Sequence, residues 1–283
     1  MKPSYEDMSR ISAVAFDLDG VVYEGNQCMA GAADTVAGLR RRGLRVFFVT
    51  NNSGKTRDEI AQKLRGMDIP ADREEIFSSG YAAAELVRRM GNKTRTMVIG
   101  TSGLERIMEE EGRNLTRTLP CDCLVVGIDN KFSYEKICLG MEAVLGGAAF
   151  IACNRDANFP VENGRLMPGA GAMVAAVEAA CRRKPHYVAG KPNTLLLEMV
   201  SQRSGLKPAE ILMVGDGTDS DIVMANRFGS PSILISGGLI SQDAREGESE
   251  GDVHAENRPG LVMKNIAEIM NLFEQAEQCG RLQ

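Results

Sequence analysis

The first residues of the chain that could do chemistry are two aspartates two positions apart, Asp17 and Asp19, between the apolar run 13–16 and Gly20. Such a run is typical of a buried parallel strand, and ligands of α/β sheets bind just beyond the carboxyl ends of the strands. While the chain stays extended, the two side chains leave the same face. Their like charges repel unless a cation joins them, and oxygen ligands of this kind suit Mg²⁺ with a substrate phosphate. The alternative for this stretch alone is an ordinary Asp- and Gly-containing turn.

Three further polar clusters follow strand-like apolar runs in the same way. They are Thr50, Asn51 and Asn52 after the run 45–49, Lys191 after the run 187–189, and Asp216, Asp219 and Asp221 after the run 211–214. Taken singly, each cluster has a turn or loop explanation. Together with the first two carboxylates, they compose a complete phosphoryl-transfer site at the ends of four predicted strands.

The elements that must position these residues alternate between strand-like and helix-like segments, the pattern of a parallel sheet covered by helices. A second alternating series lies between the second and third clusters. Its strand-like runs are 96–100, 124–128 and 149–152. We therefore predict an α/β fold with a core domain, 1–82 and 185–283, and an inserted α/β domain, 83–184. The polar, glycine- and acid-rich segment 237–258 is predicted to be an extended surface loop.

Composition excludes several classes of protein. The net charge of −5 argues against a nucleic acid or an anionic membrane as the main partner. No apolar stretch reaches the length of a membrane span, and the N-terminal residues have no hydrophobic signal core. The seven scattered cysteines are an odd number, which indicates reduced thiols inside a cell. We therefore expect a cytoplasmic protein with neither a nucleic-acid nor a membrane partner.

In their types and order, the four clusters closely resemble the motifs of the haloacid dehalogenase (HAD) superfamily of phosphatases. Within it, the chain is similar to subfamily IIA, the NagD-like or 4-nitrophenylphosphatase family. The segments that carry the resemblance are DLDGVVY at 17–23, VTNNS at 49–53, GKP at 190–192 and VGDGTDSDI at 214–222, with further likeness at 125–129, 150–156 and 168–172. The resemblance thus covers nearly the whole chain. One departure is Ser220, where the family usually has Thr, and a hydroxyl remains there.

The resemblance implies a Rossmann-like HAD core and a role for each motif residue. Asp17 would be the nucleophile that forms an aspartyl-phosphate. Asp19 would protonate the leaving alkoxide and then activate the hydrolytic water. The substrate phosphate would be held by the hydroxyl of Thr50 and by the loop residues Asn51 and Asn52. Lys191 would supply a cation beside the phosphate and the nucleophile.

The cofactor that the resemblance implies is Mg²⁺. Its ligands would be the Asp17 carboxylate, the Asp19 backbone carbonyl and the Asp216 carboxylate. Asp221 would orient either the waters of the metal or Lys191. Asp219 is interpreted as a surface residue.

Spacing distinguishes between the kinds of HAD enzyme. Asp17 and Thr50 are 33 residues apart, which leaves no room for a cap domain, whereas Thr50 and Lys191 are 141 apart. The inserted domain is therefore identified as a C2-type cap, which roofs the site and supplies specificity contacts. Asn154 and Asp156, in a polar stretch after a predicted cap strand, are candidates for the leaving-group pocket. A solvated cap loop is the alternative for that stretch.

The sequence therefore predicts a Mg²⁺-dependent phosphatase that hydrolyses small phosphorylated metabolites through a phosphoaspartate. The candidate substrates are a sugar phosphate, glycerol phosphate, phosphoglycolate, a nucleoside monophosphate and 4-nitrophenyl phosphate. The alternative is a non-catalytic phosphometabolite-binding or regulatory protein on the same fold, which would have no need of both Asp17 and Asp19. A phosphomutase would usually carry a helical cap after the first motif. Family members often dimerise through the cap, and the resemblance leaves a homodimer open.

One motif points elsewhere. Residues 169–175, GAGAMVA, are similar to the Gly-x-Gly-x-x-Ala pattern of dinucleotide-binding folds and open a predicted helix. That pattern requires a preceding apolar strand and an acidic residue about twenty positions later, and neither is present. We predict instead that these small residues allow close packing of their helix.

Overall fold

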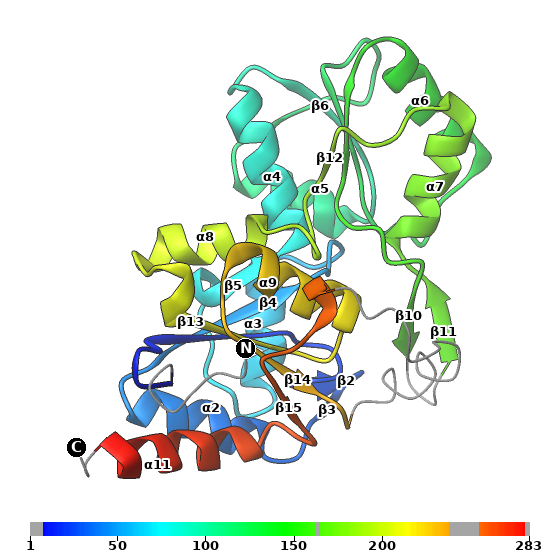
Figure 1. Ribbon diagram of the computed structural model, residues 1–283. Helices are drawn as coiled ribbons and strands as arrows, with labels where there is room; N and C mark the ends of the chain where they lie inside the picture. The colour runs from blue at the N-terminus through cyan, green and yellow to red at the C-terminus, as the bar shows by residue number, and fades with distance from the viewer. Residues whose placement is uncertain (1–7, 162–164, 238–254, 281–283) are drawn as a thin grey trace.

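The chain folds into two α/β units, each built around its own parallel sheet (Figure 1). The computed structural model describes residues 8–161, 165–237 and 255–280. Within these residues, no helix is long and apolar enough to cross a bilayer.

The first unit contains a six-stranded sheet in the order β15-β14-β13-β1-β4-β5, in which every pair of neighbours is parallel. Its strands are β1 (Ala13–Phe16), β4 (Arg45–Thr50), β5 (Ile76–Ser78), β13 (Ile211–Gly215), β14 (Ser232–Ile235) and β15 (Leu261–Met263). The chain adds β4 and β5 on one side of β1 and the last three strands on the other. The strand order therefore reverses at β1, which is where open α/β sheets bind ligands.

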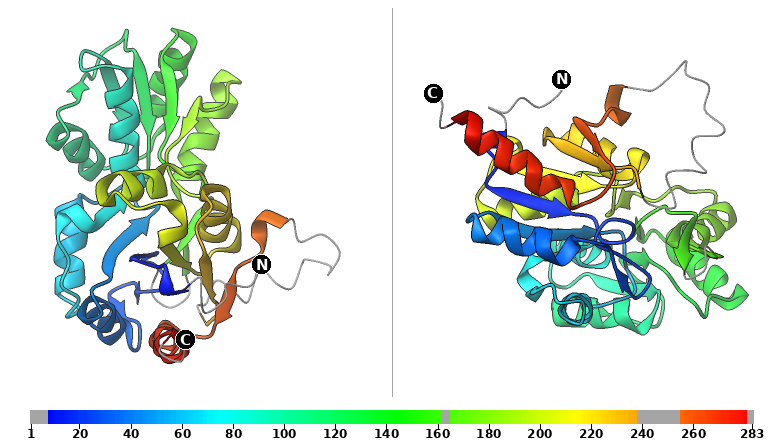
Figure 2. Two further views of the ribbon diagram at one scale, coloured as in Figure 1. Left: turned by 60° about the vertical axis from the view of Figure 1, so that its left-hand side comes forward. Right: turned by 90° about the horizontal axis from the view of Figure 1, so that it is seen from below.

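Helices cover both faces of this sheet (Figures 1 and 2). They are α2 (Ala32–Arg41), α3 (Arg57–Arg65), α4 (Ser79–Met90), α8 (Leu195–Ser204), α9 (Val223–Phe228) and α11 (Glu268–Gly280). Successive residues of β1 point to opposite faces. Val14 and Phe16 pack with α2, α3 and α11, whereas Ala13 and Ala15 pack with α4, α8 and α9. β1 is therefore buried on both sides, as its uniformly apolar sequence predicts.

The second unit contains a five-stranded parallel sheet in the order β12-β9-β8-β6-β7. Its strands are β6 (Arg95–Ile99), β7 (Asn114–Leu115), β8 (Cys123–Val126), β9 (Ala149–Ala152) and β12 (Tyr187–Val188). The helices of this unit are α5 (Ser102–Glu110), α6 (Tyr134–Leu145) and α7 (Ala170–Cys181). α6 and α7 pack together over one face, and α5 joins α4 in the cluster on the other.

The remaining strands form two short hairpins. β2 (Tyr23–Glu24) pairs with β3 (Gln27–Cys28) directly after the first motif, and β10 (Asn158–Val161) pairs with β11 (Arg165–Pro168) in the second unit. Single helical turns are η1 (Arg73–Glu75), η3 (Pro208–Glu210), η4 (Thr218–Ile222) and η5 (Ala255–Asn257). Most of the predicted loop 237–258 lies outside the described residues.

The predicted fold class, a parallel α/β core with a second α/β sheet, is confirmed. The predicted boundaries between the units stay a prediction. The first boundary, at residue 82, falls inside helix α4. At the second, β12 lies in the segment 185–283 that was predicted to belong to the core, yet it pairs with β9 of the second unit. A Cβ atom at Gly169 or Gly171 would lie 2.2 Å from Asp156 O or 2.3 Å from Arg155 O. These glycines therefore allow close packing of α7, against the loop after β9.

Candidate active site

Asp17 lies at the carboxyl end of β1 and is almost fully buried. Its backbone N–H donates to Val214 O at 2.8 Å, which continues the pairing of β1 with β13. Its Oδ1 atom accepts a hydrogen bond from Leu18 N at 2.7 Å and an ion pair from Lys191 Nζ at 2.8 Å. Burial and the carboxylates of Asp221 and Asp216 raise the pKa of Asp17, and Lys191 opposes them.

Asp19 lies on the turn after β1, and its side chain reaches solvent. Its Oδ2 atom accepts a long hydrogen bond of 3.5 Å from the Tyr23 hydroxyl. The Lys63 ammonium lies 3.4 Å from the centroid of the Tyr23 ring, as a cation–π contact. Desolvation by the surrounding protein raises the pKa of Asp19, while Lys63, Lys191 and the other nearby cation, Lys55, oppose the shift. A carboxyl group in such surroundings can exchange a proton with a leaving group beside it.

Lys191 is a buried lysine held by two carboxylates. Its Nζ atom pairs with Asp17 Oδ1 at 2.8 Å and with Asp221 Oδ1 at 2.7 Å. Burial alone would lower the pKa of Lys191, but the two neighbouring charges outweigh it and raise the pKa above its usual value. The lysine is therefore a permanent cation beside Asp17.

The third carboxylate at this edge, Asp216, directly follows β13. Its Oδ2 atom is buried and, within the described residues, has no hydrogen-bond partner. A Cβ atom at Gly20 would lie only 2.1 Å from this oxygen, so glycine is needed for the turn and the carboxylate to approach. Burial, and then the charge of Asp221, raise the pKa of Asp216 to about 7.

Carboxylate oxygens of Asp17, Asp216 and Asp221 all lie within 4.8 Å of one another. Burying so many like charges is unfavourable unless cations compensate them. An all-oxygen donor set with an unpaired buried oxygen suits a hard divalent cation such as Mg²⁺. The residues present therefore fit a divalent cation, although Asp221 belongs to this cluster and the predicted ligand set of Asp17, the Asp19 carbonyl and Asp216 stays a prediction.

Asp221 is completely buried, and its two oxygens have different partners. Oδ1 pairs with Lys191, as one of the two predicted alternatives requires. Oδ2 accepts hydrogen bonds from Gly217 N at 3.1 Å and from the Ser220 hydroxyl at 3.3 Å. The hydroxyl at the position where the sequence departs from its family thus helps to hold Asp221 in place.

Thr50 ends β4, and the loop after it leads into α3. The Thr50 hydroxyl accepts a hydrogen bond from Asn52 N at 3.1 Å, and Asn52 Oδ1 accepts from Gly54 N at 2.9 Å and Lys55 N at 3.0 Å. α3 then begins with a capping box formed by Thr56 and Glu59. The local sequence therefore gives the loop a compact turn with Thr50 buried at its start.

The second unit contacts this loop through residues at the carboxyl ends of its own strands. The bonds are Thr101 Oγ1 to Gly54 O at 3.1 Å, Ile128 N to Ser53 Oγ at 3.0 Å, and Asn154 Nδ2 to Asn51 O at 2.6 Å. The carboxyl ends of the two sheets therefore meet at the loop 50–55, with the candidate site between them.

The predicted site residues lie at this meeting point. Some of their side chains bond to one another and so have partners within the protein. The side chain of Asn51 bonds to Lys191 and Asp156, and the side chain of Asn154 bonds to Asn51 and Asp156. Asp219 is exposed, as expected. Sequence reasoning missed the role of Tyr23, although it belongs to the first motif. It also missed Lys63, for which no motif gave a signal.

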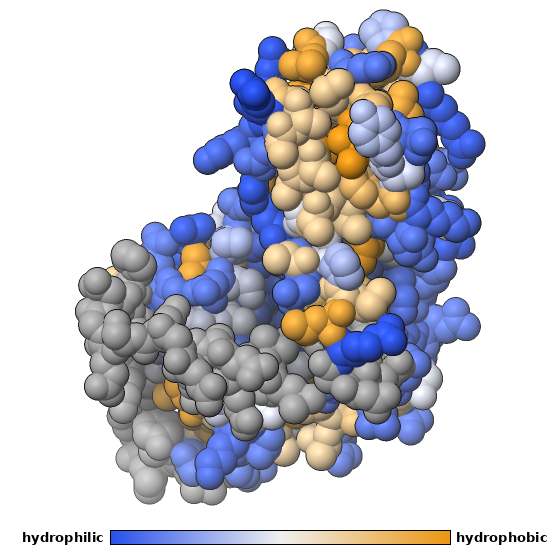
Figure 3. Space-filling view, turned by 90° about the vertical axis from the view of Figure 1, so that its right-hand side faces the viewer, coloured by the Kyte–Doolittle hydropathy of each residue, from blue (hydrophilic) through white to orange (hydrophobic). Residues whose placement is uncertain are grey.

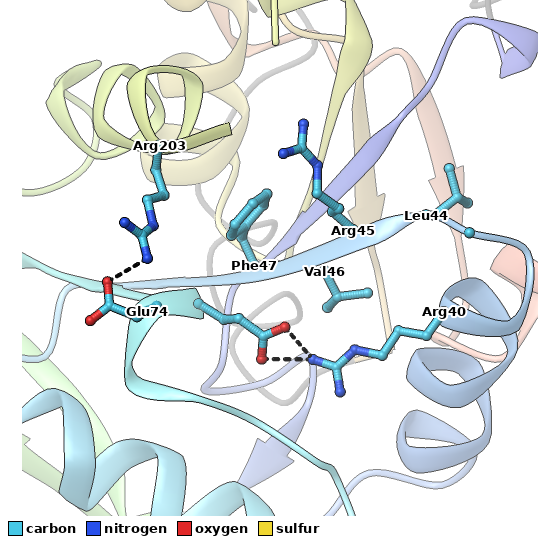
Figure 4. Close-up of a pocket in the computed structure, with 9 residues that line it drawn as sticks. Arg40, Leu44, Arg45, Val46, Phe47, Glu74 and Arg203 are labelled. Atoms are coloured by element: carbon cyan, nitrogen blue, oxygen red, sulfur yellow. Dashed lines mark hydrogen bonds and ion pairs between the residues drawn. The ribbon is translucent and has the colours of Figure 1, made fainter. Parts of the chain in front are cut away.

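A hollow of about 390 Å³ lies at the opposite, amino end of β4 and is lined by Arg45 and Phe47, among others (Figure 4). Its charged groups largely pair with one another. The pairs are Arg40 with Glu75 and Arg203 with Glu74, both at 2.8 Å. The charged groups of these pairs thus have partners, unlike the buried Asp216 oxygen at the carboxyl edge.

The geometry at the carboxyl edge, with a second α/β unit above it, defines a capped phosphohydrolase. Comparison with protein families agrees with this class. Residues 14–114 match the haloacid dehalogenase-like hydrolases, and residues 188–269 match a second family of HAD-hydrolase-like proteins. The chain belongs to the haloacid dehalogenase-like hydrolases. Within them, it is a phosphoric monoester hydrolase of the NagD and 4-nitrophenylphosphatase type, subfamily IIA, as the sequence predicted.

Individual relatives share nearly the whole length of the chain. A 5′-nucleotidase from Bacillus subtilis is 33% identical, over 88% of this chain and 96% of the relative. The crystal structure of a 4-nitrophenylphosphatase from Thermotoga maritima superposes with a TM-score of 0.85 at 28% identity, over 94% of this chain and 99% of that one. A glycerol phosphate phosphatase from Mycobacterium tuberculosis, solved in complex with magnesium, superposes with a TM-score of 0.81 at 29% identity, over 92% and 76% of the two chains.

Proposed function

We propose that this phosphatase hydrolyses small phosphate monoesters through an aspartyl-phosphate on Asp17, with Mg²⁺ as its cofactor. The observation that carries the proposal is the buried triad in which Lys191 Nζ lies 2.8 Å from Asp17 Oδ1 and 2.7 Å from Asp221 Oδ1. A lysine held in this way orients the Asp17 carboxylate at the carboxyl edge of the sheet and stabilises the negative charge of a phosphate beside it.

In the first step, an oxygen of Asp17 attacks phosphorus, the ester P–O bond breaks, and Asp19 donates a proton to the leaving alkoxide. In the second step, Asp19 takes a proton from water as the water attacks phosphorus, and the bond between Asp17 and phosphorus breaks. The Thr50 hydroxyl and the backbone of the following loop hold the phosphoryl oxygens.

Mg²⁺ would be held by the carboxylates of Asp17 and Asp216 and by the backbone carbonyl of Asp19, and it would offset the charge of the phosphoryl group. Support for this assignment comes from the unpaired Asp216 oxygen and from the magnesium complex of the mycobacterial relative. Asp221 would remain the partner of Lys191.

The three relatives described above differ in the leaving group that their names imply and share the phosphate ester. We therefore propose a small phosphorylated metabolite as substrate, with nucleoside monophosphates, glycerol phosphate, sugar phosphates, phosphoglycolate and 4-nitrophenyl phosphate as the panel to test. Phosphate release is measured with Mg²⁺ or with a chelator, and Asp17→Asn is the control. We expect Mg²⁺-dependent turnover that Asp17→Asn loses. A folded protein that releases phosphate from no ester would favour the non-catalytic alternative.

We also propose a homodimer through the cap. Apolar side chains gather on the face of the second unit that carries α6 and α7 (Figure 3). Large exposed residues there and on the neighbouring hairpin are Tyr134, Leu139, Leu145, Leu166 and Met167. Covering such a patch is favourable. Sedimentation should show a dimer that Leu145→Asp with Leu166→Asp converts to a monomer. A wild-type monomer at all concentrations would contradict the proposal.

For the compartment, we propose the cytoplasm. The six cysteines whose side chains the structure describes are all free thiols, four of them buried in the two units. Reduced, unpaired cysteines are usual in the reducing cytoplasm and uncommon in secreted proteins. Localisation of the full chain by fractionation tests this.

A further inference from the structure

The side chain of Asn51 holds the backbone of Lys191 on both sides. Asn51 Oδ1 accepts a hydrogen bond from Lys191 N at 2.8 Å, and Asn51 Nδ2 donates to Lys191 O at 3.3 Å. The approach is close because residue 190 is glycine, where a Cβ atom would lie 2.3 Å from Asn51 Oδ1. Lys191 is thus fixed at its backbone by Asn51 and at its ammonium group by Asp17 and Asp221.

The second unit sets the orientation of the Asn51 amide. Asn51 Nδ2 donates to both carboxylate oxygens of Asp156, at 3.1 and 3.0 Å. A carboxylate only accepts hydrogen bonds, so the amide must turn its nitrogen towards Asp156 and its oxygen towards the Lys191 N–H. The opposite orientation would place two donors together at Lys191 and two acceptors together at Asp156.

Asp156 is itself held in place by neighbouring groups. Its backbone N–H donates to Asn154 Oδ1 at 3.0 Å, and its backbone carbonyl accepts from Gly171 N at 2.9 Å, at the start of α7. Asn154 is nearly fully buried, and its Nδ2 atom donates to Asn51 O. The loop after β9 therefore presents Asp156 to Asn51 in a defined position.

We propose that Asn51 and Asp156 are positioning residues, through which the cap holds Lys191 in register with Asp17. They act on the lysine rather than on the leaving group of the substrate. This inference rests on the proposed phosphatase activity, because the lysine matters for phosphoryl transfer. Displacing a catalytic group by about 1 Å can lower the rate about a hundredfold, so loosening the lysine backbone should reduce kcat.

The test uses three variants that change hydrogen-bonding groups and leave side-chain shape nearly unchanged. Asp156→Asn places an amide NH₂ beside that of Asn51, and Asn51→Asp places two carboxylates together. We expect kcat to fall about tenfold in the first and up to about a hundredfold in the second. In the double variant, residue 51 accepts hydrogen bonds from both Lys191 N and residue 156, and the net charge equals that of the wild type. The double variant should therefore recover at least about tenfold over Asn51→Asp.

The matched control is Asp122→Asn. Asp122 is also a carboxylate of the second unit that accepts a backbone N–H bond, from Arg95 N at 2.7 Å, but it lies at the opposite end of the sheet. This variant should keep the wild-type kcat. All variants are compared for thermal unfolding, so that a general loss of stability is recognised.

Two readouts separate positioning from substrate contact. If Asp156 acts through Lys191, Asp156→Asn lowers kcat by the same factor for 4-nitrophenyl phosphate and glycerol phosphate and changes KM less than about twofold. If Asp156 instead contacts the leaving group, KM changes for one ester and not the other, and the proposal is overturned. Lack of rescue in the double variant would also overturn it.

A third readout does not depend on activity. Hydrogen exchange of the Lys191 amide should be faster in Asp156→Asn and Asn51→Asp than in the wild type, and unchanged in Asp122→Asn. If the wild type hydrolyses no ester, the proposed function fails, yet this measurement still decides whether Asn51 and Asp156 hold the lysine. Unchanged exchange in both site variants would refute the inference.

Discussion

Replacing Lys191 by methionine tests the idea that a buried cation holds the site together. Methionine keeps much of the volume of the side chain and removes the charge that Asp17 and Asp221 share at 2.8 and 2.7 Å. Lys191 is 4% exposed and Asp221 is fully buried, so water cannot replace the lost partner. Removing one partner of a buried ion pair costs about 3 to 5 kcal/mol. We expect a loss of that size in the free energy of unfolding, together with loss of phosphatase activity.

The assay is chemical unfolding at neutral pH with a chelator present, so that no bound metal compensates for the missing lysine. The control is Arg88→Met, which removes a cation from a surface pair with Glu85. Because Arg88 is about half exposed, solvent screens its pair with Glu85, and that change should lower the free energy of unfolding far less than Lys191→Met does. If Lys191→Met and Arg88→Met lowered the stability equally, the reasoning about buried charge would be refuted.

Three further predictions concern the edge of the sheet around Asp19. Mg²⁺ should raise the free energy of unfolding of the wild type by about 2.7 kcal/mol at a hundred times its Kd, and it should not stabilise Asp216→Asn. Thermal unfolding with and without the metal measures both effects. Gly20→Ala should lose about 1 to 3 kcal/mol of stability and the Mg²⁺ effect, because residue 20 has φ +83° and faces Asp216 Oδ2; equal Mg²⁺ shifts in variant and wild type would contradict this. Tyr23→Phe should slow transfer of the phosphoryl group to Asp17, measured in single-turnover experiments, about threefold to tenfold for glycerol phosphate and leave this step unchanged for 4-nitrophenyl phosphate, whose leaving group needs no proton; equal losses in this step on both esters would show that Tyr23 does not act through Asp19 as the acid.

Much of the fold and site could be predicted because the relevant signals are local. Asp17 and Asp216 each follow an apolar strand and Thr50 ends one, and parallel strands bring their carboxyl ends to one edge. The alternation of strands and helices likewise indicated two α/β units. The exact boundaries are less local, since β12 is only two residues long and its place is decided by pairing with β9.

The sequence by itself determined the class of chemistry, because residue types at strand ends restrict which groups can meet at the edge of the sheet. Only the tertiary structure decided how those groups are paired. It formed the ion pair between Asp221 and Lys191, and it formed the hydrogen bond between Asp156 and Asn51, which lies 105 residues earlier in the chain. No local pattern encodes such a contact, because it depends on how the second sheet docks on the loop after β4. Partners of buried polar groups are chosen by packing between units, and that choice is made when the whole chain folds.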